Sequence, residues 1–249
     1  RAATSPAVGN VAPADDQTIA VFDYVVEGES VKITSTKFAF DLGTLQVSEV
    51  TNVKLFDKAG TLLAGPSDLT DVTDSTVNTF TQEATVTYTD VIILPVGTNS
   101  LTLKVKIANA ASTDDTIRVA VADPDGDLTA KGMSTNDTIT AGPANTAVQG
   151  NLQTVQGPTL AATTLTQPAA RSVVPGLQDF VWATASFDAA NSGEDVNVTA
   201  LVIEDTLDDA ADNAGDIDNV EIWADLTSGN SSRGDRFETK VSGTKQLAD

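Results

Sequence analysis

The sequence predicts an all-β fold, and three observations support this prediction. Apolar and polar residues alternate in several short stretches, which is the pattern of strands with one buried face. Thr is abundant at 35 residues, and Asp outnumbers Glu by 27 to 8, which favours strands joined by Asp-bearing turns. Turn signals separate the alternating stretches without long helical runs, which indicates antiparallel sandwiches rather than a parallel sheet.

The predicted elements follow one another at short spacing. Residues 1–14 lack periodicity and predict a connector or a loosely held strand. From Gln17 onward the alternation is clear, with its apolar positions at Val31 and Ile33, Val53 and Leu55, Leu101 to Ile107, and Ile117 to Val121. Turns are predicted between them at residues 27–29, 57–60, 95–99 and 123–127.

The composition changes after residue 140. Residues 141–178 are rich in Ala, Thr, Gln and Pro and carry almost no charge. They predict one or two last strands of a first domain followed by an extended connection, with Leu152, Val155 and Leu160 as apolar anchors. We therefore expect four parts, with bounds at 1–14, 15–145, 146–175 and 176–249.

An internal repeat is the most informative feature of the sequence. Residues 28–34 (Gly-Glu-Ser-Val-Lys-Ile-Thr) match residues 193–199 (Gly-Glu-Asp-Val-Asn-Val-Thr) at an offset of 165. Residues 50–56 match residues 217–223 in the same order at an offset of 167. Two ordered blocks at nearly one offset indicate two copies of one module, with a longer loop in the second copy.

The second copy is predicted to be incomplete. The first copy continues for some eighty residues after Phe56, whereas 26 residues follow Trp223. We expect the chain to continue beyond Asp249, with strand donation by a neighbouring molecule as the alternative, because an unclosed sandwich exposes its edges. The chain begins at Arg1 without an apolar leader, which predicts a processed chain or a fragment.

Composition and charge exclude several classes of function. The 249 residues contain no His and no Cys, so thiol nucleophiles, Ser-His-Asp triads and zinc fingers are excluded. A net charge of −21 argues against nucleic-acid binding, which needs a basic surface. No stretch approaches 18 apolar residues, so no membrane span is predicted.

The repeated motifs resemble those of a known class of proteins. Gly-Glu-x-Val-x-Val/Ile-Thr, the Asn-Val-x-Leu/Ile-Phe/Trp strand, and Pro95-Val96-Gly97-Thr98 before the strand from Leu101 to Ile107 are similar to the immunoglobulin-like repeats of bacterial cell-surface and S-layer-like proteins, especially those of candidate-phyla bacteria. The resemblance covers most of 15–140 and again 176–226. It implies tandem immunoglobulin-like antiparallel β-sandwiches at the cell exterior, in a coat, filament or adhesin stalk.

Calcium is the cofactor that the acidic residues favour, and the first candidate site is a turn. Asp123, Asp125 and Asp127 place three carboxylates within five residues, and Ca²⁺ prefers clustered oxygen ligands. The turn does not follow the EF-hand pattern, because Leu128 and Ser134 stand where Gly and Glu would be required. A solvated Asp/Gly turn is the alternative.

A second candidate calcium site lies in the second copy. Six carboxylates fall within fourteen residues, and their mutual repulsion favours a counter-ion. They belong to Asp205, Asp208, Asp209, Asp212, Asp216 and Asp218. A disordered acidic loop is the alternative here.

The sequence therefore predicts a non-enzymatic structural subunit that associates with identical subunits at the cell surface. An acid-pair glycosidase is disfavoured, because such clefts are lined with aromatic rings and Trp182 and Trp223 are predicted to be core residues of strands. The alternatives are an adhesin or carbohydrate-binding stalk with a glycan or host-cell ligand, and a viral surface or tail protein.

Overall fold

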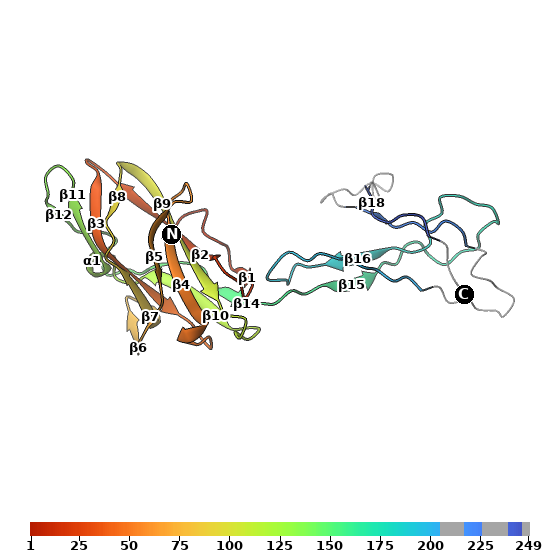
Figure 1. Cartoon of the computed structure of the whole chain (residues 1–249), viewed down its shortest axis with the longest axis horizontal. Helices are drawn as coiled ribbons and strands as arrows, with labels where there is room; N and C mark the ends of the chain where they lie inside the picture. The colour runs from red at the N-terminus through yellow and green to blue at the C-terminus, as the bar shows by residue number, and fades with distance from the viewer. Residues whose placement is uncertain (205–216, 226–238, 246–249) are drawn as a thin grey trace. The chain divides into compact units, whose positions relative to one another are not determined.

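The computed structural model describes residues 1–204, 217–225 and 239–245, and these residues are predominantly β (Figure 1). They divide into two compact units, Arg1–Asn197 and Val198–Asp249. The first unit contains β1 (Gly9–Val11), β2 (Gln17–Val26), β3 (Val31–Asp41), the 3-10 turn η1 (Val47–Glu49), β4 (Val50–Phe56), β5 (Leu62–Ser67), β6 (Thr70–Val77), β7 (Phe80–Tyr88), β8 (Ile92–Leu94), β9 (Gly97–Ile107), β10 (Thr116–Val121), α1 (Pro124–Asp127), β11 (Leu128–Gly132), β12 (Thr138–Ile139), β13 (Val148–Gln149), β14 (Gln153–Val155), β15 (Ala161–Thr164) and β16 (Ala185–Asp188). The second unit contains β17 (Trp223–Ala224) and β18 (Thr239–Lys240).

One sheet of the first unit has the strand order β2-β9-β4-β5, and all its pairs are antiparallel. The long strand β9 lies between β2 and β4. Its apolar residues alternate with Thr and Lys, and they are all buried at Leu101, Leu103, Val105 and Ile107. The alternation therefore turns one face of this sheet inward.

The other sheet is built around β3. Strands β7 and β8 pair with one edge of β3, and β10 and β11 pair with the other. The sheet extends through β6 beside β7, β12 beside β11, and β13 and β14 beside β10. Strand β1 adds to β14 in the parallel direction, so this sheet is mixed.

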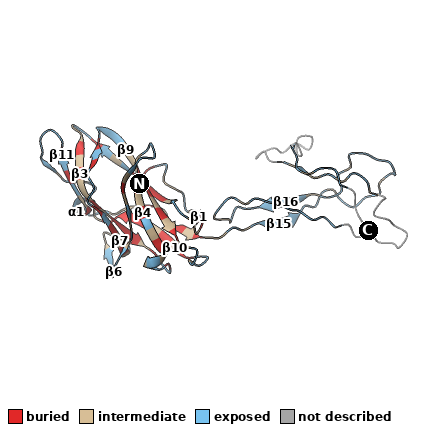
Figure 2. Cartoon of the chain, in the orientation of Figure 1, coloured by how far each residue is buried: buried red, intermediate tan, exposed pale blue. Residues whose placement is uncertain are grey.

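The buried faces of the two sheets share one hydrophobic core (Figure 2). Phe22 of β2 packs against Phe38 of β3 with ring centroids 5.7 Å apart, and Phe38 meets Tyr88 of β7 at 6.3 Å. The Tyr88 hydroxyl donates a buried hydrogen bond of 2.7 Å to the Val53 carbonyl in β4. Aromatic packing and this hydrogen bond thus join the sheets across the core.

The prediction of an all-β fold is confirmed, and the predicted apolar positions of β3, β4, β9 and β10 lie in the core. The arrangement as tandem immunoglobulin-like domains stays a prediction. No helix among the described residues is long and apolar enough to cross a membrane.

The expected connection after residue 145 contributes to the first core. Strands β13 and β14 pair with β10, and Val155 and Gln153 are buried. Of the expected apolar anchors, Val155 is in the core, whereas Leu152 and Leu160 are exposed. The first compact unit extends to Asn197, and the domain bounds at 145 and 175 stay a prediction.

The later strands of the described chain are short and exposed. Strands β15 and β16 pair with each other, and all eight of their residues are exposed (Figure 2). In the second unit, β17 pairs with β18, and Val220 forms an isolated bridge with Lys245. These elements therefore have the strand geometry of the first core without its burial.

Candidate functional site

The predicted acidic turn joins β10 to β11, and its third acid is already neutralised. Asp127 is buried at the end of the one-turn helix α1, and one of its carboxylate oxygens lies 2.5 Å from the Lys37 ammonium of β3. Its other oxygen accepts the backbone N–H of Asp123 at 2.9 Å. Asp127 therefore serves as the internal anchor of this turn, because its ion pair and hydrogen bond compensate its burial.

The first two acids of the turn lie close together. Asn78 donates a hydrogen bond of 3.0 Å to the Asp123 carboxylate and another of 3.0 Å to the Ala122 carbonyl. The Asp125 carboxyl, within hydrogen-bonding reach, raises the pKa of Asp123. Two ionised carboxylates this close repel each other, and a bound cation would relieve that repulsion. Ca²⁺ usually takes six to eight oxygen ligands, which is more than these two carboxylates supply.

The described residues contain no group of three or more acidic side chains arranged to hold a metal ion. Of the second acidic cluster, Asp218 is described and exposed. The other members lie outside the described residues, and they are Asp205, Asp208, Asp209, Asp212 and Asp216. Calcium binding at both loops stays a prediction.

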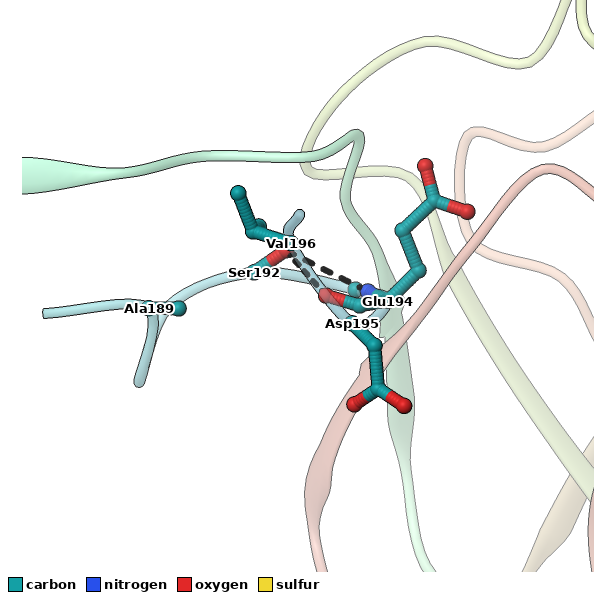
Figure 3. A pocket seen from close by; sticks show the side chains of 6 residues that line it. Ala189, Ser192, Glu194, Asp195 and Val196 are labelled. Atoms are coloured by element: carbon teal, nitrogen blue, oxygen red, sulfur yellow. Dashed lines mark hydrogen bonds between the residues drawn. The ribbon is translucent and has the colours of Figure 1, made fainter. Parts of the chain in front are cut away.

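A hollow of about 500 Å³ lies at the loop that follows β16 (Figure 3). The Ser192 hydroxyl donates to the Glu194 carbonyl at 2.6 Å, and the Glu194 N–H donates back to it at 3.3 Å. The carboxylates of Glu194 and Asp195 extend away from this hydrogen-bonded turn (Figure 3). The lining residues are Ala189, Ser192, Gly193, Glu194, Asp195 and Val196. This lining offers two carboxylates and one hydroxyl, and the hydroxyl is engaged in the hydrogen bonds of its own turn.

Backbone groups of the same loop form hydrogen bonds with β1 and with the segment that follows β14. Asn10 of β1 donates to the Asn191 carbonyl at 3.0 Å, and the Gly193 N–H points to the Gly157 carbonyl at 3.4 Å. A Cβ at Gly193 would overlap the Gln156 carbonyl oxygen, so a larger residue cannot approach as closely. This contact could not be predicted from the local pattern, because Gly193 and Gln156 are 37 residues apart in the sequence.

A second hollow, of about 570 Å³, lies beside η1. One of its acids, Asp68, accepts the backbone N–H of Asn52 at 3.0 Å and so supports a bend in β4. The lining residues are Gln46, Val47, Ser48, Val50, Thr51, Asp68, Leu69 and Asp71. Like the first hollow, it presents hydroxyl, amide and carboxylate groups.

The largest pKa shifts among the described residues have structural causes. Burial raises the pKa of Tyr24 to about 12, with the Thr36 hydroxyl acting in the opposite direction, and burial also raises the pKa of Tyr88. In the second unit, Lys240 lies 2.5 Å from Glu221 and lowers the pKa of that carboxyl to about 2, with help from Thr244. These groups stabilise strands, and none of them lines either hollow.

The two Trp residues are not core residues, and that prediction was wrong. Trp182 lies outside any strand and is 57% exposed, and Trp223 in β17 is 45% exposed. Phe180 packs edge-on against Trp182 with ring centroids 5.0 Å apart, and the Arg171 guanidinium lies 4.6 Å from the Phe180 ring. The strand pattern alone could not reveal this, because burial depends on the elements that cover a strand.

The comparisons with known proteins leave the family open. No protein-family model matches the chain, and no curated protein sequence matches it. One solved structure, described as "AvmM Catalyzes Macrocyclization in Alchivemycin A Biosynthesis", is similar over 62% of this chain and 86% of its own, with 11% identity and a TM-score of 0.33. A likeness at that level carries no functional argument.

Proposed function

We propose that the chain is a structural subunit of an extracellular surface assembly, such as an S-layer-like coat or a filament, built from immunoglobulin-like repeats. The observation that carries this proposal is the internal repeat, in which the strand pattern of the first core recurs at offsets of 165 and 167. Serial modules of this kind are typical of elongated and lattice-forming proteins.

The charge of the chain suggests how assembly is controlled. At a net charge of −21, free subunits repel one another at low ionic strength. Divalent cations would screen this repulsion and would be attracted to the close pair Asp123 and Asp125. Self-association of identical subunits would then depend on calcium.

Electron microscopy of the full chain in millimolar calcium, with a matched chelator sample, tests the proposal. We expect sheets or filaments in calcium that disperse in chelator. The double variant Asp123→Asn with Asp125→Asn is expected to raise the calcium requirement, whereas Asp127 is left intact because it pairs with Lys37. Assemblies that form equally well in chelator would refute the calcium dependence.

Glycan binding in an adhesin stalk is the second candidate function. It is favoured by the exposed ring of Trp182 beside Phe180, because exposed aromatic rings stack on sugars. Single particles in both calcium and chelator would favour this function over the structural one.

A further inference from the structure

Aromatic side chains lie exposed in the segment that joins β15 to β16, residues 165–184. Phe180 packs edge-on against Trp182 with ring centroids 5.0 Å apart, and the Arg171 guanidinium lies 4.6 Å from the Phe180 ring. Trp182 is 57% exposed, and Phe180 is half-buried. Asp179, which directly precedes Phe180, is exposed as well. We call Arg171, Asp179, Phe180 and Trp182 the aromatic patch.

The internal repeat shows where this patch lies in the module. Residues 20–23 (Ala-Val-Phe-Asp) in β2 and residues 185–188 (Ala-Ser-Phe-Asp) in β16 share three of four residues at an offset of 165. The block from Gly28 and Gly193 has the same offset. Each residue of the patch therefore has a counterpart in the first copy, 165 positions earlier.

The counterparts of the two rings lie at the surface of the first copy. Phe180 corresponds to Asp15, and Trp182 corresponds to Gln17. The Asp15 side chain is 71% exposed, and Gln17 is half-buried. Strands that closed the second copy as they close the first would therefore leave both rings in contact with solvent. The patch is thus a surface feature rather than part of a core.

The patch also lies in a part of the chain that carries little charge. Residues 165–184 contain one Arg and one Asp and are otherwise uncharged, whereas the whole chain has a net charge of −21. Two molecules with this charge repel each other. The repulsion is smallest where they meet through an uncharged segment, because charge interactions weaken with distance.

The two charges of the patch make it complementary to itself. Neither Arg171 nor Asp179 has an ion-pair partner among the described residues. A two-fold contact between identical molecules brings each residue of a pair against its opposite number in both directions. Arg171 of each molecule can then pair with Asp179 of the other. Aromatic residues and Arg are also enriched at the centres of protein interfaces.

We infer that the aromatic patch is a two-fold contact between two molecules of this chain. The rings of Phe180 and Trp182 form its apolar centre, and Arg171 and Asp179 form its ion pairs. The inference rests on the proposed structural role, because it names one contact through which identical subunits associate. It makes no use of the pair Asp123 and Asp125, so the contact does not require calcium.

Sedimentation equilibrium of the full chain in chelator tests the contact, at about 0.15 M salt to screen the net charge. We expect dimers whose fraction rises with protein concentration. Trp182→Ala should raise the dissociation constant of the dimer by about tenfold or more, because it removes the central ring. Trp223→Ala is the matched control, since it removes a ring that is 45% exposed outside the patch, and it should leave the constant unchanged.

Exchanging the two charges tests the two-fold arrangement. Arg171→Glu and Asp179→Lys each place like charges opposite one another, so each should raise the dissociation constant by about tenfold. The double variant has opposite charges in those places again and keeps the net charge at −21, so it should recover most of the dimer.

Three outcomes would overturn the inference. One is a monomer at every concentration, which would also favour the glycan candidate for the same rings. The second is equal dimerisation of Trp182→Ala and the original chain, and the third is a double variant that dimerises no better than the single ones. Sheets or filaments in calcium without dimers in chelator would refute this contact and retain the proposed function.

Discussion

The two copies of the repeat have similar strand patterns and opposite burial. Phe22 and Ile33 of the first copy are 2% and 1% exposed, whereas Phe187 and Val198, their counterparts at the offset of 165, are 45% and 48% exposed. The first copy lies in a core that two sheets close, and the described strands of the second copy have no such cover. The comparison teaches that alternation specifies a strand with one apolar face, while partner strands determine whether that face is buried.

The copies also differ in the use of their shared Glu. The Glu29 carboxylate accepts a hydrogen bond of 2.7 Å from the Thr135 hydroxyl and another from the Ser134 N–H, and these bonds lower its pKa. They tie the β11–β12 turn to the start of β3. The Glu194 carboxylate extends away from its own turn (Figure 3). The Glu of this motif thus links two segments only where a neighbouring turn supplies hydrogen-bond donors to its carboxylate.

The largest expected effect comes from truncating Phe22, compared with truncating its counterpart Phe187. Phe22→Ala should lower the free energy of unfolding of the first unit by about 3–5 kcal/mol, because it removes a buried ring packed on Phe38. Phe187→Ala should change it by less than about 0.5 kcal/mol, because that ring is exposed. Urea denaturation followed by far-ultraviolet circular dichroism measures both. Equal losses would contradict the difference in burial between the copies.

Alkaline pH should unfold the first unit through its Tyr residues. Burial raises the pKa of Tyr24 to about 12, above the unfolded value near 10. Stability from this group is complete below pH 10 and falls as the pH rises toward 12, because the unfolded chain ionises first. The expected loss for Tyr24 is about 1.4 kcal/mol per pH unit in that window.

The aromatic residues allow the two copies to be followed separately in the same titration. Both Tyr residues belong to the first core or its edge, whereas both Trp residues lie after residue 180. Tyr absorbance should report ionisation and unfolding of the first unit, and Tyr24→Phe should flatten the dependence above pH 10. Unchanged stability of the original chain through pH 12 would argue against a buried Tyr24 hydroxyl.

The smallest effects should come from the repeated Gly residues, and they should differ in kind. Gly28 has a φ of +80° with open space around it, so Gly28→Ala should cost about 1 kcal/mol of global stability through backbone strain. Gly193→Ala should instead push the loop away from Gln156, because the added Cβ meets the Gln156 carbonyl oxygen. Amide exchange at position 193 and at Thr159 should then be faster. Urea denaturation and hydrogen exchange of both variants measure this. Loop exchange that is unchanged in Gly193→Ala would show that the loop is not held by this contact.

Some strands were predictable from local pattern, and others were not. The alternation of Leu101, Leu103, Val105 and Ile107 predicted β9, because every inward position is apolar. The sequence predicted one or two last strands within residues 141–178 but not the bounds of β14, because one inward residue of β14 is polar. Gln153 is 2% exposed, and its amide donates to the Ala7 carbonyl at 2.8 Å, a partner 146 residues away.

The acidic turn shows the same limit for the candidate site. Clustering of Asp123, Asp125 and Asp127 was visible in the sequence. The neutralisation of Asp127 by Lys37 was not, because the two residues meet only when β11 folds back along β3. A carboxylate held by such an ion pair is less available to a metal than its spacing suggests.

The sequence by itself determined the all-β class, the positions of the regular strands, the two pairs of repeated sequence blocks and the strongly acidic charge. These properties depend on residues that are neighbours along the chain or on composition alone. Only the tertiary structure decided which copy is buried, which acid is paired and which strand edge lacks a partner among the described residues. Burial and pairing are long-range properties, because each requires a second strand that the local pattern does not identify.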